Sequence, residues 1–142
     1  SAVGMGTVTP RATLDVDGNV RLKTYFEAVK SVSPSSNVVT IDLSEAQTFD
    51  VDVTSAITQF TISNIPSESS SFTLKVSQDS TGGYAVGIDT FKTSGGAAIP
   101  VYWSGSVVPV VTTTASKTDI YNFITFDGGS SFYGVSGGQN FG

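Results

Sequence analysis

The chain has 142 residues, a length that suits one domain or one domain with a short extension. Hydrophobic residues make up 39% of it and charged residues 13%, which is enough for a packed core and argues against a disordered chain. Seven Lys and Arg against twelve Asp and Glu give a net charge of −5 without a basic stripe, so we expect no nucleic-acid partner. Because the chain has neither Cys nor His, Ser-His-Asp and Cys-His catalysis within one chain and the usual zinc sites are excluded.

The first segment in chain order is "VGMGTVTPRATLDVDGNVRL" (3–22). If Asp15 is taken as position one of an EF-hand loop, Asp17 and Asn19 fall at ligand positions. The glycine, however, comes at position four instead of six, and position twelve is Phe26 instead of the glutamate that clamps the ion. An Asp-Gly pair between "LDV" and "VRL" is typical of a tight hairpin turn. The sequence therefore favours a β-hairpin over a calcium site, and we expect neither metal nor cofactor.

A leading hairpin of this size is too short to bury its own apolar face, because an isolated hairpin is marginal in water. Its apolar side chains need a partner, which would be either the rest of the chain or the same segment of neighbouring chains. The residues in question are Val3, Met5, Leu14, Val16, Val20 and Leu22. We interpret residues 1–30 as a hairpin and oligomerisation segment and the Ser-rich residues 31–37 as a linker; the stretch 23–30 has a weak helical pattern that also fits a strand.

Alternation of apolar and polar residues with a period of two dominates the remainder, residues 38–142, and predicts strands throughout. The stretch "DIYNFITF" (119–126) is apolar on both faces, which is typical of a central strand covered on each side. We expect an all-β antiparallel β-sandwich of jelly-roll type, a knob preceded by the short N-terminal hairpin. The other predicted strands are "VVTIDL", "TFDVDV", "FTISNI", "FTLKVSQ", "YAVGID" and "SFYGVSG".

Three glycine pairs separate these stretches and predict hairpin reversals, because glycine tolerates the positive φ angles that such turns need. They are Gly82-Gly83, Gly95-Gly96 and Gly128-Gly129. No apolar run is long enough to span a bilayer, so we expect no membrane partner.

Carboxylate chemistry is the remaining route to catalysis. Asp50 and Asp52 alternate with apolar residues, so we expect a solvent-facing strand surface, and Asp42 and Asp119 have the same pattern. A polysaccharide depolymerase would need two carboxylates about 5–10 Å apart in a groove. The sequence favours a protein that is not an enzyme, with depolymerase activity as the least favoured alternative.

Tyr102 stands beside the only tryptophan, Trp103. The pair could form a platform for a ligand or a partner, since aromatic faces stack on sugars and anchor interfaces. Alternatively, the period of two places Trp103 in the core and Tyr102 on the opposite face. The second interpretation is favoured, because large aromatic side chains are usually well buried.

The leading segment resembles the pattern VGIGTxxPxxxLDVxGNVR of bacteriophage tail fibres and related virion appendages. The matching residues are Val3-Gly4-Met5-Gly6-Thr7, Pro10, Leu14-Asp15-Val16 and Gly18-Asn19-Val20-Arg21, with Met5 in place of the commoner Ile. Three later stretches, 72–86, 102–129 and 132–141, are similar to a C-terminal domain of phage structural proteins. The Trp-Pro usual after the glycine-turn hairpin in that domain is replaced here by Gly87-Ile88-Asp89.

The resemblance implies a virion structural protein such as a fibre, appendage or surface-decorating subunit. In that family the leading segment often lies along a threefold axis, which implies a homotrimer. It further implies other virion proteins as partners, assembly in the host cytoplasm and exposure on the particle surface. A host receptor or cell-surface glycan, contacted through Tyr102 and Trp103, is the alternative functional expectation.

Overall fold

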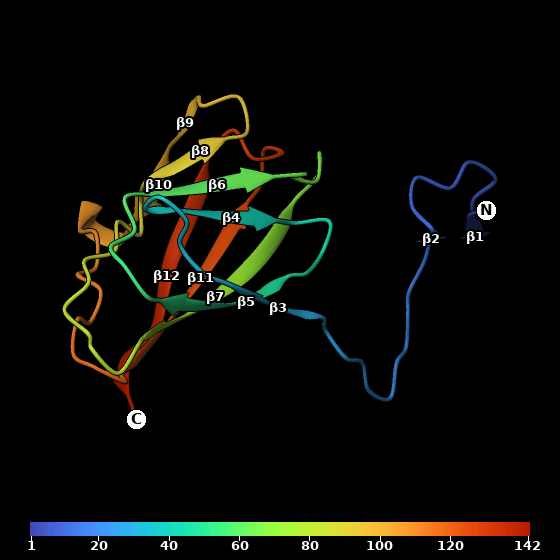
Figure 1. Cartoon of the computed structure of the whole chain (residues 1–142). Coiled ribbons are helices and arrows are strands. Elements are labelled where there is room, and N and C mark those ends of the chain that lie inside the picture. Colours follow the sequence, from blue (N-terminus) through green and yellow to red (C-terminus); the bar gives the residue numbers. More distant parts are fainter.

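The computed structural model describes all residues from 1 to 142 and is nearly all β, as predicted (Figure 1). It contains a two-stranded, a six-stranded and a four-stranded sheet. A single turn of 3-10 helix, Ser104–Ser106, interrupts the strands. The strands are β1 (Val3–Met5), β2 (Leu14–Val16), β3 (Val29–Val32), β4 (Val38–Asp42), β5 (Thr48–Val53), β6 (Gln59–Ser63), β7 (Ser70–Gln78), β8 (Phe91–Thr93), β9 (Ala98–Ile99), β10 (Val101–Trp103), β11 (Thr118–Thr125) and β12 (Phe132–Phe141).

The two larger sheets form a body, residues 29–142, from which residues 1–28 extend as a leader (Figure 1). From β3 to β8 the chain alternates between the sheets: β3, β5 and β7 join the six-stranded sheet, and β4, β6 and β8 the four-stranded one. Neighbours within each of these two series run parallel. This part of the chain therefore forms a superhelix, and each of its turns contributes one strand to each of the two sheets.

The prediction of an antiparallel sheet is wrong for most of the molecule, because six of the nine strand pairings are parallel. Alternation with a period of two fixes which face of a strand is buried, but it carries no information on the direction of the neighbouring strand. Parallel neighbours need a crossover connection, and from β3 to β8 each crossover is a strand of the opposite sheet. Antiparallel pairing is limited to β11 with β7 and β12, and β8 with β9.

A cluster of phenylalanines fills the space between the sheets. Phe72 of β7 stacks on Phe123 of β11 with ring centroids 5.2 Å apart and on Phe91 of the opposite sheet at 6.1 Å. Phe132 and Phe49 meet the same ring edge-on. Each ring is almost completely buried. The predicted inward positions of β4 to β7 are confirmed, since alternate residues such as Val39, Ile41, Phe49, Val51 and Val53 are fully buried.

The glycine pairs have different roles in the structure. Gly95-Gly96 connects β8 to β9, and Gly128-Gly129 connects β11 to β12, as expected for antiparallel hairpins. The hairpin predicted at Gly82-Gly83 does not form, because β7 and β8 lie in different sheets. The stretch 84–89 is correspondingly not a strand and makes only an isolated bridge from Val86 to Ile57.

The N-terminal region also differs from the prediction. β1 and β2 pair in parallel, with Val3 opposite Leu14 and Met5 opposite Val16, so they are not a hairpin. No strand follows Asp17-Gly18 until β3. β3 pairs with β5 in the six-stranded sheet, so residues 29–30 of the expected leading segment and residues 31–32 of the expected linker form a strand of the body. No helix in the structure is long and apolar enough to cross a membrane.

Candidate assembly and contact surfaces

The β1–β2 unit holds together through backbone contacts and tight glycine packing. Val3 N donates to Thr13 O at 2.8 Å and Asp17 N donates to Met5 O at 2.9 Å, closing the ladder at both ends. Gly6 has φ of +78°, and a Cβ there would lie 2.6 Å from the carbonyl oxygen of Asp17. The glycine is therefore required for the close approach of the two strands.

The side chains that the sequence predicts as an assembly face share one side of this small ladder. In the ladder Val3 is paired with Leu14 and Met5 with Val16, and the pair between them, Gly4 with Asp15, faces the other side. Val3, Met5 and Leu14 are 57–60% exposed, and Val16 is half-buried. The structure thus brings four of the six predicted residues together, although through a parallel ladder instead of a hairpin.

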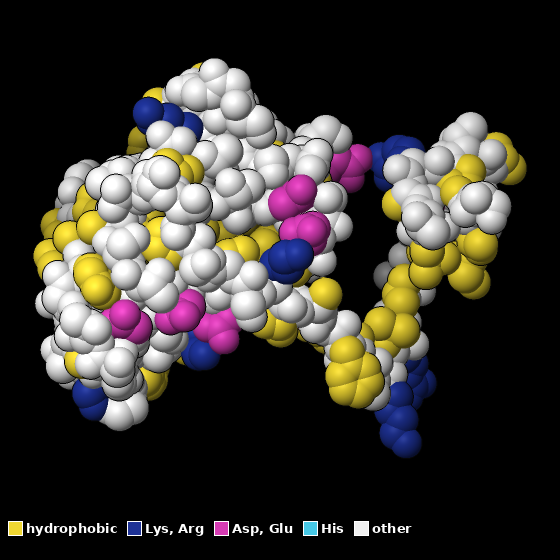
Figure 2. Space-filling view, in the orientation of Figure 1, with side chains coloured by type: hydrophobic (Ala, Val, Ile, Leu, Met, Phe, Trp, Pro, Cys, Tyr) yellow, Lys and Arg dark blue, Asp and Glu magenta, His cyan; other side chains and the backbone are white.

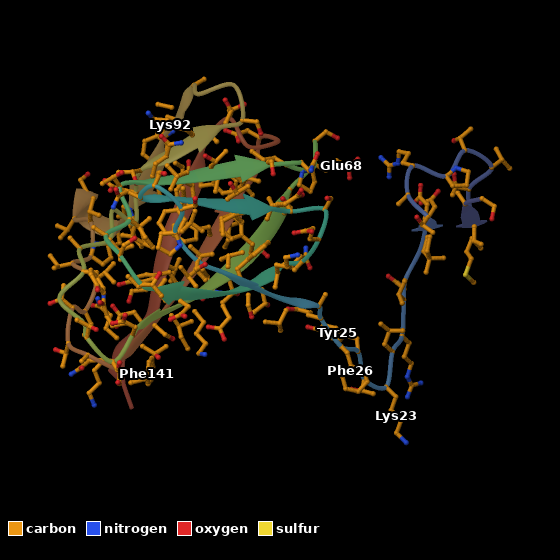
Figure 3. All side chains as sticks on the ribbon, viewed as in Figure 1. Lys23, Tyr25, Phe26, Glu68, Lys92 and Phe141 are labelled. Carbon is orange, nitrogen blue, oxygen red and sulfur yellow. The ribbon has the colours of Figure 1, made fainter.

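Val20 and Leu22 lie outside the ladder, on the extended stretch that leads to the body. Both are about 60% exposed. Tyr25 and Phe26, further along the same stretch, are 68% and 95% exposed and project from the chain between the ladder and the body (Figure 3). Sequence reasoning missed these two rings because it treated residues 23–30 only as a strand or a weak helix. Figure 2 shows hydrophobic side chains gathered along the leader and standing clear of the body.

Contact between the β1–β2 unit and the body is slight. Arg11 Nη1 lies 2.6 Å from Glu68 Oε1 in the loop between β6 and β7, and both side chains are largely exposed. Arg11 also faces Asp15, whose carboxylate accepts a hydrogen bond from Arg11 N at 2.8 Å. An exposed ion pair contributes at most about 1 kcal/mol, so the apolar face of the leader gains little cover from its own chain.

Trp103 and Tyr102 point to opposite faces of β10, as the favoured interpretation predicts. The Trp103 ring packs edge-on against Tyr121 at 6.0 Å and Phe123 at 5.6 Å, next to the buried core. Its Nε1 is buried without a hydrogen-bond partner. Trp103 is therefore a packing residue and does not form a platform together with Tyr102.

Tyr102 instead belongs to a row of exposed rings that sequence reasoning missed. Tyr102 on β10 stacks obliquely on Tyr133 of β12, its register partner, at 5.5 Å. Tyr133 in turn meets Phe126, which follows β11, at 5.8 Å. We call Tyr102, Tyr133 and Phe126 the aromatic ledge. The signal available in the sequence was the second apolar face of "DIYNFITF" and "SFYGVSG".

The prediction that β11 is covered on both sides is wrong, because only one of its faces is buried. β11 is central, between β7 and β12, and Asp119, Tyr121, Phe123 and Thr125 face the core. Its other face, which carries Ile120, Asn122 and Ile124, remains partly exposed. The apolar residues there form part of an outer surface of the six-stranded sheet.

The carboxylates of the chain do not converge on a site. Asp50 on the outer face of β5 pairs with Lys75 of β7 at 3.0 Å, and Asp52 is exposed. Asp42 accepts hydrogen bonds from Asn64 and from the Ser44 side chain and backbone, which lower the pKa of its carboxyl group. The structure contains no group of three or more His, Cys, Asp or Glu side chains placed to hold a metal ion.

The prediction that Asp119 faces solvent is wrong. It is 1% exposed, and its carboxylate accepts hydrogen bonds from Thr112 N at 2.7 Å, Asn140 N at 2.8 Å, Gln139 Nε2 at 3.1 Å and Tyr121 Oη at 3.0 Å. Burial favours the neutral acid, but these donors outweigh it and hold the pKa of Asp119 below its ordinary value. Burial and the adjacent charge of Asp119 together raise the pKa of Tyr121. Asp119 thus ties the end of β12 to Thr112.

Comparison of the chain with protein-family models, with curated proteins and with solved structures gives no match in any of the three. The surfaces that stand out are consequently defined by geometry alone: the apolar face of the β1–β2 ladder and the aromatic ledge.

Proposed function

We propose that this chain is a non-enzymatic structural subunit of a bacteriophage particle, which assembles as a homotrimer through its leader. The observation that carries the proposal is the face formed by Val3, Met5 and Leu14, more than half exposed on a two-stranded ladder with no core beneath it. A ladder of this size is marginal in water and gains stability when another surface covers it. The resemblance of residues 3–22 to virion appendages supports a second copy of the chain as that surface.

In this proposal the leaders of three chains bury one another's apolar faces around a common axis. Val20, Leu22, Tyr25 and Phe26 extend the buried strip toward the bodies. Each body, packed as a sandwich of two sheets, projects outward as a knob on the particle surface. Multiple linked copies raise the effective concentration of each contact, so weak contacts with other virion proteins suffice for attachment.

The oligomeric state of the full chain in solution tests the proposal. Light scattering coupled to size exclusion should give three times the 14.7 kDa mass of one chain at micromolar concentration. Leu14→Asp and Met5→Asp place charges on the ladder face, and each should shift the mass toward one chain, since an unpaired charge is costly to bury. Val8→Asp is the matched control, because Val8 is 97% exposed in the loop outside the ladder.

Two results would count against the proposal. One is a wild-type chain that remains a single copy at all concentrations with the leader protected from proteolysis. The other is a trimer that survives both ladder substitutions, which would place the contacts elsewhere on the molecule.

A further inference from the structure

The aromatic ledge differs from the rest of the molecule's surface in having three neighbouring rings exposed together. Tyr102, Tyr133 and Phe126 are 52%, 47% and 69% exposed, and successive rings are 5.5 and 5.8 Å apart. They come from β10, β12 and the residue after β11, all held by the six-stranded sheet. The positions of Tyr102 and Tyr133 are therefore fixed by strands, and Phe126 stands at the start of the loop that connects β11 to β12.

The surface around the ledge carries no charged side chain on these strands. Next to the ledge, the outward-facing residues are Ile124 on β11 and Val135 on β12. Asn122 is the next outward residue along β11, and its amide donates a hydrogen bond to Thr73 Oγ1 at 2.7 Å. Ser71 lies opposite Ile124 on β7. The nearest charged pair on this face, Lys75 with Asp50, lies at the level of Ile120, roughly 13 Å along the strand from Ile124. Asp127, next to Phe126, is engaged by Thr125 and Ser131.

The size of the ledge decides what kind of partner it fits. At 47–69% exposure, the three rings present roughly 250–420 Å² of aromatic surface. A standard protein interface takes about 800 Å² from each partner, so the ledge alone is too small to hold a second protein. It falls instead within the range of single functional patches on monomeric proteins.

We propose that the aromatic ledge binds a neutral carbohydrate. The C–H-bearing faces of sugar rings pack on aromatic faces by dispersion. The planes of Tyr102 and Phe126 are inclined to that of Tyr133 by 44° and 66°, so a sugar stacked on one ring meets the edge of its neighbour, and a short oligosaccharide contacts more than one of them. Sugar hydroxyls meet the two tyrosine hydroxyls and the uncharged rim of Ser71, Thr73 and Asn122. The absence of Lys and Arg at the ledge disfavours phosphorylated or carboxylated ligands.

A shallow hollow continues the site at its Tyr102 end. It has a volume of about 150 Å³ and is lined by Val101, Tyr102, Trp103, Ser106 and Val108. Pockets for drug-sized ligands are about 300–1,000 Å³, so this hollow fits one sugar ring at most. β10 is an edge strand here, which leaves backbone groups on its free side to meet sugar hydroxyls.

Titration of the full chain with neutral oligosaccharides tests the site, with saturation-transfer NMR as the readout. The probes are cellotetraose, maltotetraose and chitotetraose, with tetragalacturonate as the charged comparison. We expect one neutral probe to bind with a dissociation constant of about 1 mM. Tyr133→Ala should weaken binding at least tenfold, because the middle ring touches both neighbours, whereas Tyr133→Phe keeps the ring and should stay within about threefold of wild type. Phe26→Ala, an exposed aromatic on the leader, is the matched control and should not change binding.

Three outcomes overturn the proposal. The first is no saturation transfer from any neutral probe at about 10 mM, ten times the expected dissociation constant. The second is binding that Tyr133→Ala leaves unchanged while its unfolding curve matches wild type. The third is a loss of self-association in Tyr133→Ala without any loss of sugar binding, which would make the ledge a contact between copies. The leader variants described above should bind the probe like wild type, so failure of the assembly proposal and failure of this site give different results.

Discussion

Gly134 of β12 lies directly beneath the indole ring of Trp103 on the neighbouring strand β10. A Cβ on Gly134 would come within 2.6 Å of Trp103 Cη2 and 2.7 Å of Cζ2 and Cζ3. The two residues are also register partners in the parallel β10–β12 pair. The missing side chain of Gly134 is therefore what lets the large ring lie flat against the sheet beside Phe123 and Tyr121.

Gly134→Ala should lower the free energy of unfolding by about 1–3 kcal/mol, because the added methyl group overpacks the contact with Trp103. Urea denaturation followed by far-UV circular dichroism measures the change in every variant, including those that lack Trp103. Gly95→Ala is the control, since a Cβ there has only Thr93 Oγ1 at 3.8 Å, and its effect should stay within about 0.5 kcal/mol. Adding Trp103→Phe to Gly134→Ala removes the clashing ring atoms, so the two substitutions should couple favourably; strict additivity would contradict the packing described here.

Gly82 and Gly83 offer a test that separates backbone strain from close packing. Both have positive φ, +64° and +82°, but a Cβ on Gly82 would lie 2.5 Å from Ala115 N, whereas one on Gly83 meets nothing within 4 Å. Gly83→Ala should destabilise by about 1 kcal/mol through φ alone. Gly82→Ala should destabilise more, by at least about 1 kcal/mol further, in thermal or urea unfolding. Equal effects would mean that the 113–115 segment does not press against this loop.

Asp119 should make stability depend on acid pH. Its pKa in the folded chain is lower than the ordinary value of 3.8, so its contribution is present above that value and is lost as the pH falls through the folded pKa. Asp119→Asn removes the charge and turns an amide N–H₂ toward the Thr112 or Asn140 N–H donor, which should cost about 2 kcal/mol near neutral pH. The difference between wild type and variant should shrink below about pH 4, because only the wild type titrates there.

Urea unfolding of both proteins between pH 3 and pH 7 measures this prediction. Asp42 and Asp127 also have lowered pKa values, but they are present in both proteins and cancel in the difference. A wild-type-to-variant difference that is constant with pH would mean that the pKa of Asp119 is the same in the folded and unfolded chains, so that the hydrogen bonds to its carboxylate do not outweigh its burial.

The Arg11–Glu68 ion pair should contribute little to stability. Both side chains are largely exposed, so Glu68→Gln should change the unfolding free energy by less than about 1 kcal/mol, and added salt should reduce the effect further. The ion pair should instead limit how far the leader moves relative to the body. The distribution of distances between spin labels at residue 12 of the leader and residue 92 of the body measures that movement. Glu68→Gln should broaden that distribution, and an unchanged distribution would show that other contacts hold the leader.

The sequence by itself determined the all-β class and the buried face of most strands. Period-two alternation identified Val39, Ile41, Phe49, Val51 and Val53 as inward residues, since a strand presents successive side chains to opposite faces. It also identified the apolar residues of the leader, because a ladder of two short strands has no second layer to bury them. The hairpins at Gly95-Gly96 and Gly128-Gly129 followed from the conformational freedom of glycine.

The direction of neighbouring strands was decided only by the tertiary structure, since parallel and antiparallel partners bury the same alternating residues. For the same reason, Gly82-Gly83 could not be distinguished from a hairpin until β7 and β8 were seen in opposite sheets. Asp119 has the same local pattern as Asp50, and only the distant donors of Thr112, Gln139 and Asn140 make its burial favourable. The aromatic ledge likewise depends on the register that places Tyr133 between Tyr102 and Phe126, residues that lie far apart in the sequence and meet only across the sheet.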